Sequence, residues 1–248
     1  MKAIMLCAGY ATRLYPLTES KPKALLPLAD KPMMNYLVDK LVEIPELDKI
    51  FVISNAKFYQ AFQDWKKEYY PKRSIAVLND GTTTNDNRLG AIRDIQFVLQ
   101  KEKVKDDVIV LASDNYFDFD LESFVKEAKS HKPKATIAVY DVNNIELAKR
   151  YGLVECSQDK RITRFLEKPK EPTTTLASTG VYFFPKETLG LIDVYLKGPQ
   201  NSDAPGHYVK WLVSDSQVFA FSFKGTWYDI GDFESYQKAD EEIRRIVK

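Results

Sequence analysis

The first half of the chain alternates short apolar runs with stretches whose apolar residues recur at helical spacing. Runs such as Asp107–Ala112 (DVIVLA) are almost wholly apolar, which is typical of strands covered on both faces. Stretches such as Ala56–Tyr69 place aromatic residues on one helical face. The predicted strands are Lys2–Cys7, Lys49–Ser54, Ser74–Leu78, Asp107–Ala112 and Ala135–Tyr140, and the predicted helices are Lys31–Ile44, Ala56–Tyr69, Arg88–Leu99 and Leu121–Ser130.

This alternation predicts an α/β fold with a doubly wound, mostly parallel sheet. Ligands of such sheets bind beyond the carboxyl ends of the strands, so the loops after Cys7, Leu78 and Ala112 are candidate site positions.

The second half of the chain predicts a small β-rich extension to the same domain. Its predicted elements are a hairpin of Gly152–Cys156 and Arg161–Glu167, strands Leu176–Phe184 and Gln217–Phe223, and helices Lys186–Leu196 and Asp232–Val247. The irregular stretch Gly198–Gly206 is predicted to be a mobile surface loop. No composition change marks a linker, so residues 1–248 are predicted to form a single domain.

Composition excludes several function classes. The chain has 36 Lys and Arg against 35 Asp and Glu, so no global charge favours nucleic acid or an anionic membrane. No apolar run approaches the roughly 20 residues that span a bilayer, and the apolar start is too short for a signal peptide. Cys7 and Cys156 lie in separate apolar runs and are predicted to be buried free thiols. A cytoplasmic protein is expected, and no pattern indicates or excludes a homo-oligomer.

The first candidate chemistry follows the first strand. The small-residue turn Ala8–Arg13 leads into a loop that carries Lys23. A buried strand that feeds such a turn presents backbone N–H groups to a phosphate, and the basic side chains supply the opposite charge. The alternative is an ordinary loop between a strand and a helix.

Two further loops carry polar groups at strand ends. Asp114 follows the predicted strand Asp107–Ala112, where a carboxylate is well placed to hold Mg²⁺, although aspartate is also common in turns. The Asn-rich loop Asn79–Gly90 follows Ser74–Leu78, and its alternative role is to cap the next helix.

Four segments near the start resemble a known signature. They are Leu6–Leu14, Pro16–Thr18, Lys21–Lys23 and Leu25–Pro27. In one register they resemble AGxGTRLxPLTxxxPKxLLP, the opening signature of the sugar-phosphate nucleotidyltransferases, or NDP-sugar pyrophosphorylases. Ala11 stands at the family's second glycine, although alanine restricts positive φ. The resemblance implies a Rossmann-like, GT-A-like fold in which residues 1–140 bind the nucleotide and residues 141–248 bind the acceptor and close the site.

Three downstream segments are similar to further motifs of the family. Ser113-Asp114-Asn115 resembles the motif whose aspartate is a metal ligand, and Trp227–Tyr236 resembles WxDxGTxxxY, with Asp232 at the usual threonine. By that match Asp114 and Asp229 would hold the same Mg²⁺. Phe165–Pro169 resembles the EKP motif, in which the glutamate binds acceptor hydroxyls and the lysine neutralises the acceptor phosphate.

The resemblance implies a full set of site residues. The catalytic residues would be Arg13, Lys23 and Lys168. The nucleotide would be bound by Leu6, Ala8, Gly9, Tyr10, Ala11, Thr12, Arg13, Lys23, Asn79, Thr84, Asn85, Asn87, Leu89, Gly90 and Ser113. The acceptor would be bound by Asn115, Glu167, Lys168, Thr179 and Gly180.

The implied activity is Mg²⁺-dependent in-line attack of a sugar 1-phosphate on the α-phosphate of an NTP, which forms an NDP-sugar and pyrophosphate. The expected partners are therefore an NTP and a phosphorylated acceptor. The Asn79–Gly90 loop lacks the Gln-Pro pattern of the members that select thymidine or uridine and looks like the loop of cytidylyltransferases. A cytidylyltransferase acting on choline phosphate or a polyol phosphate is therefore an alternative. A non-catalytic nucleotide-binding regulator is an alternative of another class.

Overall fold

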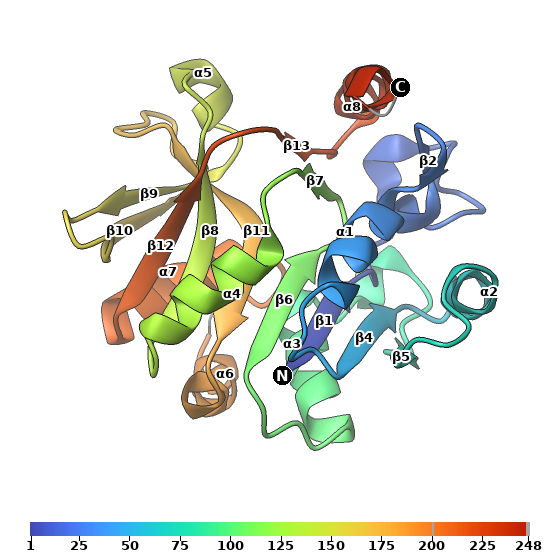
Figure 1. Cartoon of the computed structure of the whole chain (residues 1–248), viewed down its shortest axis with the longest axis horizontal. Helices are drawn as coiled ribbons and strands as arrows, with labels where there is room; N and C mark the ends of the chain where they lie inside the picture. Colours follow the sequence, from blue (N-terminus) through green and yellow to red (C-terminus); the bar gives the residue numbers. More distant parts are fainter. Residues whose placement is uncertain (200, 247–248) are drawn as a thin grey trace.

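A mixed nine-stranded sheet with helices on both faces forms the centre of the molecule (Figure 1). The computed structural model describes residues 1–199 and 201–246. The strands are β1 (Lys2–Leu6), β2 (Pro27–Leu28), β3 (Lys31–Pro32), β4 (Lys49–Ser54), β5 (Ile75–Asn79), β6 (Val108–Ala112), β7 (Asn115–Phe117), β8 (Ala135–Asp141), β9 (Gly152–Cys156), β10 (Ile162–Glu167), β11 (Leu176–Phe184), β12 (Val218–Phe223) and β13 (Trp227–Asp229). The α-helices are α1 (Met33–Val42), α2 (Tyr59–Tyr69), α3 (Ala91–Lys101), α4 (Leu121–Ser130), α5 (Ile145–Ala148), α6 (Gly190–Lys197), α7 (Pro205–Asp215) and α8 (Phe233–Ile246).

One half of the sheet is parallel. Strands β6, β1, β4 and β5 lie side by side in that order, and every pairing among them is parallel. Their carboxyl ends therefore meet at one edge, which lies toward the top of Figure 1. This arrangement brings the loops that follow Leu6, Asn79 and Ala112 together.

The other half of the sheet contains the antiparallel strand β11. It pairs with β6 on one side and β8 on the other, and β12 then pairs with β8 in parallel. The predicted hairpin is confirmed as β9–β10, and β9 pairs with β11. The sheet is thus mixed, and the predicted α/β fold class is confirmed.

The helices bury one apolar stripe each against the sheet. Helices α1, α2 and α4 cover one face, and α3, α6 and α7 cover the other. Phe124 of α4 and Ile92 of α3 are fully buried in these two layers. Burial of one such side chain contributes about 1.5–3 kcal/mol, so the helix faces fix the sheet and the loops at its edge.

Several predicted helices begin later than the periodicity indicates. Helix α3 begins at Ala91 because Gly90 has a left-handed φ of +87°, which an α-helix does not accept. Helix α1 begins after Pro32, and α2 begins after Phe58. The predicted end of the last helix at Val247 lies outside the described residues, and α8 is described to Ile246.

The predicted surface loop Gly198–Gly206 ends two residues earlier than expected, its mobility stays a prediction, and Gln200 within it lies outside the described residues. Helix α7 starts at Pro205, a residue that favours the first turn of a helix. The carbonyls of Ser202 and Asp203 accept hydrogen bonds from the N–H groups of Ile92 and Ala91 at 3.0 and 3.2 Å. This segment is therefore attached to the start of α3.

The prediction that both thiols are buried was wrong for one of them. Cys7 is buried, whereas Cys156 is exposed because it ends strand β9 at the rim of the hairpin. Among residues 1–199 and 201–246, no helix has both the length and the apolar character required to cross a membrane.

Candidate active site

The turn after β1 contains a residue in the left-handed conformation that glycine favours, although this residue, Ala11, is an alanine. Ala11 has φ +48° and ψ +43°, the left-handed region. Its carbonyl accepts a hydrogen bond from the buried hydroxyl of Thr18 at 2.8 Å and from the Leu14 N–H at 2.9 Å. These bonds hold a conformation that costs an alanine about 1–2 kcal/mol, so the turn contains a left-handed residue at this position without a glycine.

Neighbouring strands hold the start of this turn from both sides. The buried side chain of Asn55, just after β4, donates to the Ala8 carbonyl at 2.9 Å. The hydroxyl of Ser113, just after β6, donates to the Leu6 carbonyl at 2.7 Å. These two hydrogen bonds fix the start of the turn to the ends of β4 and β6. The sequence analysis missed Asn55. It could have been found as an amide side chain that directly follows the predicted strand Lys49–Ser54.

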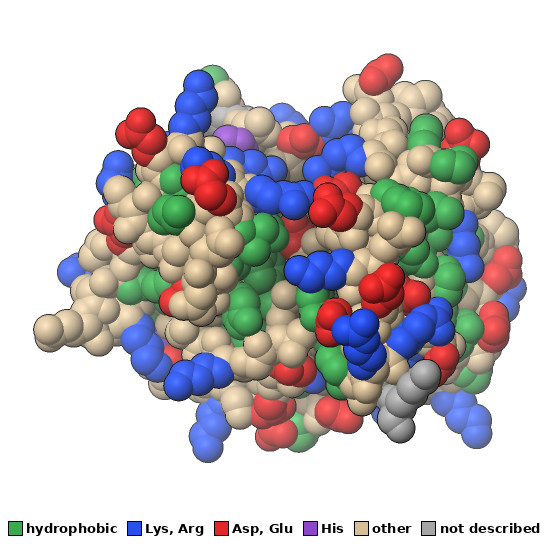
Figure 2. All heavy atoms as spheres, turned by 90° about the horizontal axis from the view of Figure 1, so that it is seen from above, with side chains coloured by type: hydrophobic (Ala, Val, Ile, Leu, Met, Phe, Trp, Pro, Cys, Tyr) green, Lys and Arg blue, Asp and Glu red, His purple; other side chains and the backbone are tan. Residues whose placement is uncertain are grey.

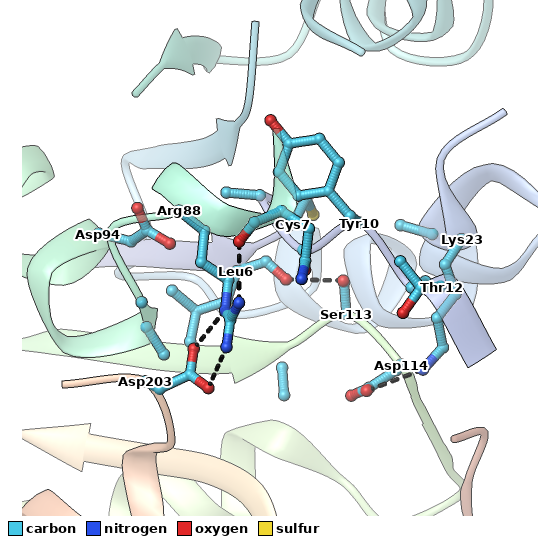
Figure 3. A pocket seen from close by; sticks show the side chains of 18 of the residues that line it. Leu6, Cys7, Tyr10, Thr12, Lys23, Arg88, Asp94, Ser113, Asp114 and Asp203 are labelled. Atoms are coloured by element: carbon cyan, nitrogen blue, oxygen red, sulfur yellow. Dashed lines mark hydrogen bonds and ion pairs between the residues drawn. The ribbon is translucent and has the colours of Figure 1, made fainter. Parts of the chain in front are cut away.

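A cavity of about 540 Å³ opens beside the turn (Figure 3). It is bounded by the turn, the start of α3, the end of β6 and the segment before α7. Twelve predicted site residues line it: Leu6, Ala8, Gly9, Tyr10, Ala11, Thr12, Arg13, Lys23, Asn85, Gly90, Ser113 and Asp114. Figure 2 shows this side of the molecule from above, with basic side chains gathered near its middle beside acidic ones.

Charged groups from distant motifs meet at one end of the cavity. The Lys23 ammonium lies 2.9 Å from a carboxylate oxygen of Asp114. Strand β13 pairs with β7 so that Asp229 is opposite Asn115. A Cβ atom added to Gly231 would lie 3.8 Å from both a guanidinium nitrogen of Arg13 and a carboxylate oxygen of Asp229.

The pKa of Asp229 also shows that these charged groups lie close together. Burial, together with the negative charge of Asp114, raises this pKa to about 6, although Lys23, Arg13 and Lys168 act in the opposite direction. Four charged groups, predicted from three separate motifs, therefore influence this one carboxyl.

The carboxylates at this end of the cavity suit a Mg²⁺ ion that is held by few protein ligands. Within the part of the chain that the structure describes, no cluster of three or more His, Cys, Asp or Glu side chains could hold a metal. Asp114 and Asp229 remain as two adjacent carboxylates. Magnesium is commonly held by one or two carboxylates together with substrate phosphates, so these two residues could hold it.

The predicted acceptor residues lie beside this end, outside the cavity lining. Lys168 has a left-handed φ of +45°, and its N–H donates to the Tyr151 carbonyl. Thr179 is buried and donates its hydroxyl to the Ala138 carbonyl at 3.0 Å. Gly180 has φ +75°, and a Cβ there would lie 3.1 Å from the Asn115 amide nitrogen. The close approach at Gly180 is therefore to the loop after β6.

A carboxylate oxygen of Glu167 lies beside two glycines, Gly152 and Gly206. An added Cβ at Gly152 would lie 3.1 Å from it. The glycines give this carboxylate room between the β9–β10 hairpin and the start of α7.

Part of the Asn-rich loop satisfies its own backbone. Asn79 accepts from the Gly81 N–H at 2.8 Å, and Asn87 accepts from the Thr84 N–H at 3.0 Å in a capping box. Of the predicted loop residues, Asn79, Thr84, Asn87 and Leu89 do not line the cavity, whereas Asn85 and Gly90 do.

Sequence reasoning missed three charged residues at the other end of the cavity. Arg88 and Asp203 form a two-point ion pair at 2.8 and 2.9 Å. Asp94 lies on the buried side of α3 beside Ile95 and Val98, and it also lines the cavity. Its available signal was an aspartate within the apolar stripe of a predicted helix.

Comparison with protein families now identifies the chain. The sequence model described as "Nucleotidyl transferase" matches residues 2–246. The chain belongs to this family. The family prediction made from the sequence motifs is confirmed.

Individual relatives match across nearly the whole chain. A provisionally named mannose-1-phosphate guanyltransferase of Sulfolobus acidocaldarius is 33% identical over 243 residues, which cover 98% of this chain and 63% of that protein. The bifunctional protein GlmU of Methanocaldococcus jannaschii is 29% identical over 93% of this chain and 51% of its own length. A mannose-1-phosphate guanyltransferase of Gibberella zeae is 30% identical over 93% of this chain and 61% of its length. The chain thus spans about half to two thirds of these relatives.

Solved structures share the fold. The structure of apo UDP-glucose pyrophosphorylase matches with a TM-score of 0.81 and 19% identity, covering 100% of this chain and 99% of that one. A provisionally named glucose-1-phosphate thymidylyltransferase of Bacillus anthracis matches with a TM-score of 0.81 and 24% identity, covering 98% of this chain and 95% of that one. These matches agree with the mixed, mainly parallel α/β sheet.

Proposed function

We propose that the chain transfers a nucleotidyl group from an NTP to a sugar 1-phosphate, forming an NDP-sugar and releasing pyrophosphate. The observation that carries this proposal is the convergence of Lys23, Asp114 and Asp229 beside the turn after β1. The names of two relatives, both mannose-1-phosphate guanyltransferases, support a sugar 1-phosphate as the acceptor.

The turn and its basic neighbours would bind the triphosphate. The backbone of Ala8–Thr12 lines the cavity, where its N–H groups would suit phosphate oxygens, and Lys23 and Arg13 add opposite charge. Lys23 would act closest to the bond that breaks. Charge that develops on the α-phosphate and on the departing pyrophosphate is stabilised by such preorganised groups.

The acceptor would enter from the side of Lys168 and Glu167. Lys168 would hold its phosphate, while Glu167, Asn115 and the Thr179–Gly180 segment would bind the sugar. An oxygen of the acceptor phosphate forms a bond to the α-phosphorus, and the bond between the α-phosphorus and its bridging oxygen breaks. The electron pair leaves with pyrophosphate. A phosphate monoester is already ionised near neutral pH, so no general base is needed.

Asp114 and Asp229 would hold Mg²⁺, which supplies charge neutralisation for the phosphates when bound. Residues 1–140 would bind the nucleotide and residues 141–248 the acceptor. The cytidylyltransferase alternative rested on the Asn-rich loop, and two of its asparagines, Asn79 and Asn87, cap the loop's own backbone.

A pyrophosphate-release assay tests this function. The four NTPs and dTTP would be crossed with a panel of sugar 1-phosphates and with choline phosphate, with and without Mg²⁺. We expect release that requires both a sugar 1-phosphate and Mg²⁺. Release only with CTP and choline phosphate would assign the alternative substrate, and nucleotide binding without any turnover would assign a regulatory protein.

A further inference from the structure

The cavity has two chemically different ends. In Figure 3, Lys23 and Asp114 lie on one side, whereas Asp94, Arg88 and Asp203 lie on the other. The first end has the charges proposed to bind the triphosphate and metal. A nucleotide whose phosphates occupy that end would extend its base toward Asp94.

Asp94 is an unusual residue at this position. It is 6% exposed, and among the described residues its Oδ1 is a buried oxygen without a hydrogen-bond partner. The ion pair of Arg88 is made with Asp203, so that cation does not neutralise Asp94. An unsatisfied buried acceptor costs roughly 1–3 kcal/mol, and a ligand that brings N–H donors would recover this free energy.

We propose that Asp94 determines base specificity by accepting two N–H donors from the Watson–Crick edge of guanine. The inference rests on the proposed function, because it takes the end with Lys23 as the phosphate end. A carboxylate offers acceptors only. Guanine presents two adjacent donors, N1–H and N2–H. Uracil and thymine flank one N–H with two carbonyls, and adenine and cytosine place a ring acceptor beside their amino group, so each of these edges repels a carboxylate.

Protonation of Asp94 links this recognition to pH. Burial, together with the charges of Asp80 and Asp203, raises the pKa of Asp94 to about 8. The groups that face it are Cys7 just after β1, Asp80 after β5, and the ion pair of Arg88, before α3, with Asp203, before α7. Two N–H donors favour the ionised carboxylate, so guanine binding near pH 7 should release a proton. A protonated carboxyl that paired with cytosine or adenine would show the opposite dependence, with binding weakened above pH 8.

Calorimetry with nucleoside diphosphates tests the inference without turnover. GDP, CDP, ADP and UDP would be titrated into the whole protein with EDTA, at pH 7, in buffers of different ionisation enthalpy. We expect GDP to bind at least tenfold more tightly than the other three and to release close to one proton. Equal affinities, or GDP binding without proton release, would overturn the proposal.

A variant changes the recognition pattern in a defined way. Asp94→Asn offers one acceptor and one donor, which match N1–H and the 2-oxo group of xanthine. We expect it to bind xanthosine diphosphate at least tenfold more tightly than GDP, while the exposed control Asp86→Asn keeps the parent preference. Retained GDP preference in Asp94→Asn would contradict the proposal. If the variant fails to fold, the proton release of the parent still decides.

The two proposals fail in different ways. If GDP binds as expected but no NTP yields pyrophosphate with any sugar 1-phosphate, the proposed function is wrong and the base assignment stands. If turnover occurs with equal rates for CTP, UTP and GTP, the function stands and the role of Asp94 is wrong.

Discussion

The ammonium of Lys23 lies 2.9 Å from a carboxylate oxygen of Asp114, although 91 residues separate the two in sequence. The lysine side chain is only 12% exposed, so this ion pair is partly shielded from water. It joins the segment that resembles PKxLLP to the carboxylate after β6, which places a candidate phosphate-binding cation beside a candidate metal ligand.

Replacement of this lysine should remove most turnover. We expect Lys23→Ala to lower the rate of pyrophosphate release by on the order of 10²–10³, the effect of losing one preorganised charge contact. The exposed Lys21, two residues earlier and outside the cavity lining, offers a matched control. A Lys23→Ala protein that is as active as Lys21→Ala would show that this lysine does not act on the reaction.

The second carboxylate should affect magnesium dependence. We expect Asp229→Asn to raise the Mg²⁺ concentration for half-maximal activity by on the order of tenfold or more, because one of two ligands becomes neutral. Its unfolding midpoint should not fall, since a partly buried charge is removed. The exposed turn residue Asp159 provides the control Asp159→Asn. An unchanged magnesium titration would assign Asp229 a structural role only.

The left-handed residue of the turn should accept glycine and reject valine. Ala11→Gly removes the conformational cost that alanine has at φ +48° in the folded chain. It also increases the conformational entropy of the unfolded chain, which offsets part of this gain in stability. We expect its free energy of unfolding to rise by about 0–1 kcal/mol with activity kept. Ala11→Val should be clearly destabilised, because a β-branched residue disfavours positive φ. Denaturant unfolding measures the free energy of unfolding of both variants. Equal values for Ala11→Gly and Ala11→Val would contradict a strained backbone at this position.

The contact between α3 and the segment before α7 should depend on Gly90. A Cβ at this position would lie 2.7 Å from the Ser202 carbonyl oxygen and 2.8 Å from the Asp203 Cα, and φ is +87°. We expect Gly90→Ala to lower the free energy of unfolding by about 1–3 kcal/mol and to weaken nucleotide binding. Gly190 has open space around it and serves as the control Gly190→Ala. Similar stability of both variants would contradict this packing.

The buried carboxyl of Asp94 should make stability fall as pH rises. Its pKa of about 8 lies above the 3.8 of an unperturbed aspartate, so the folded chain holds a proton that the unfolded chain has lost between these values. Relative to Asp94→Asn, the parent should lose on the order of a few kcal/mol of stability between pH 4 and pH 8. Urea unfolding at both pH values measures this, and parallel pH curves for the two proteins would show that Asp94 titrates normally.

The parallel half of the sheet could be predicted because its strands are apolar runs separated by amphipathic helices. The direction of β11 could not, since periodicity reports which face is buried and not which way a strand runs. Helix α7 was missed because Pro205 and Gly206 at its start resemble loop residues. Its core positions, Tyr208 and Leu212, carry the helical spacing.

The charged end of the cavity could be predicted because its residues lie in contiguous motifs. The other end could not. Arg88 and Asp203 are 115 residues apart, and their pairing depends on how α7 packs against α3. The position of Asp94 in the apolar stripe of a predicted helix indicated burial, but only the structure shows that it lies beside a cavity.

The fate of each phosphate tests the central claim most directly. GTP labelled in the α-phosphate and GTP labelled in the γ-phosphate would be incubated separately with the protein, Mg²⁺ and mannose 1-phosphate, and the products separated. We predict the α label in the NDP-sugar and the γ label in pyrophosphate. Transfer of the γ label to the sugar would contradict nucleotidyl transfer at this site. So would the recovery of both labels in unreacted NTP, when the experiment is repeated with the other NTPs and with every sugar 1-phosphate tested.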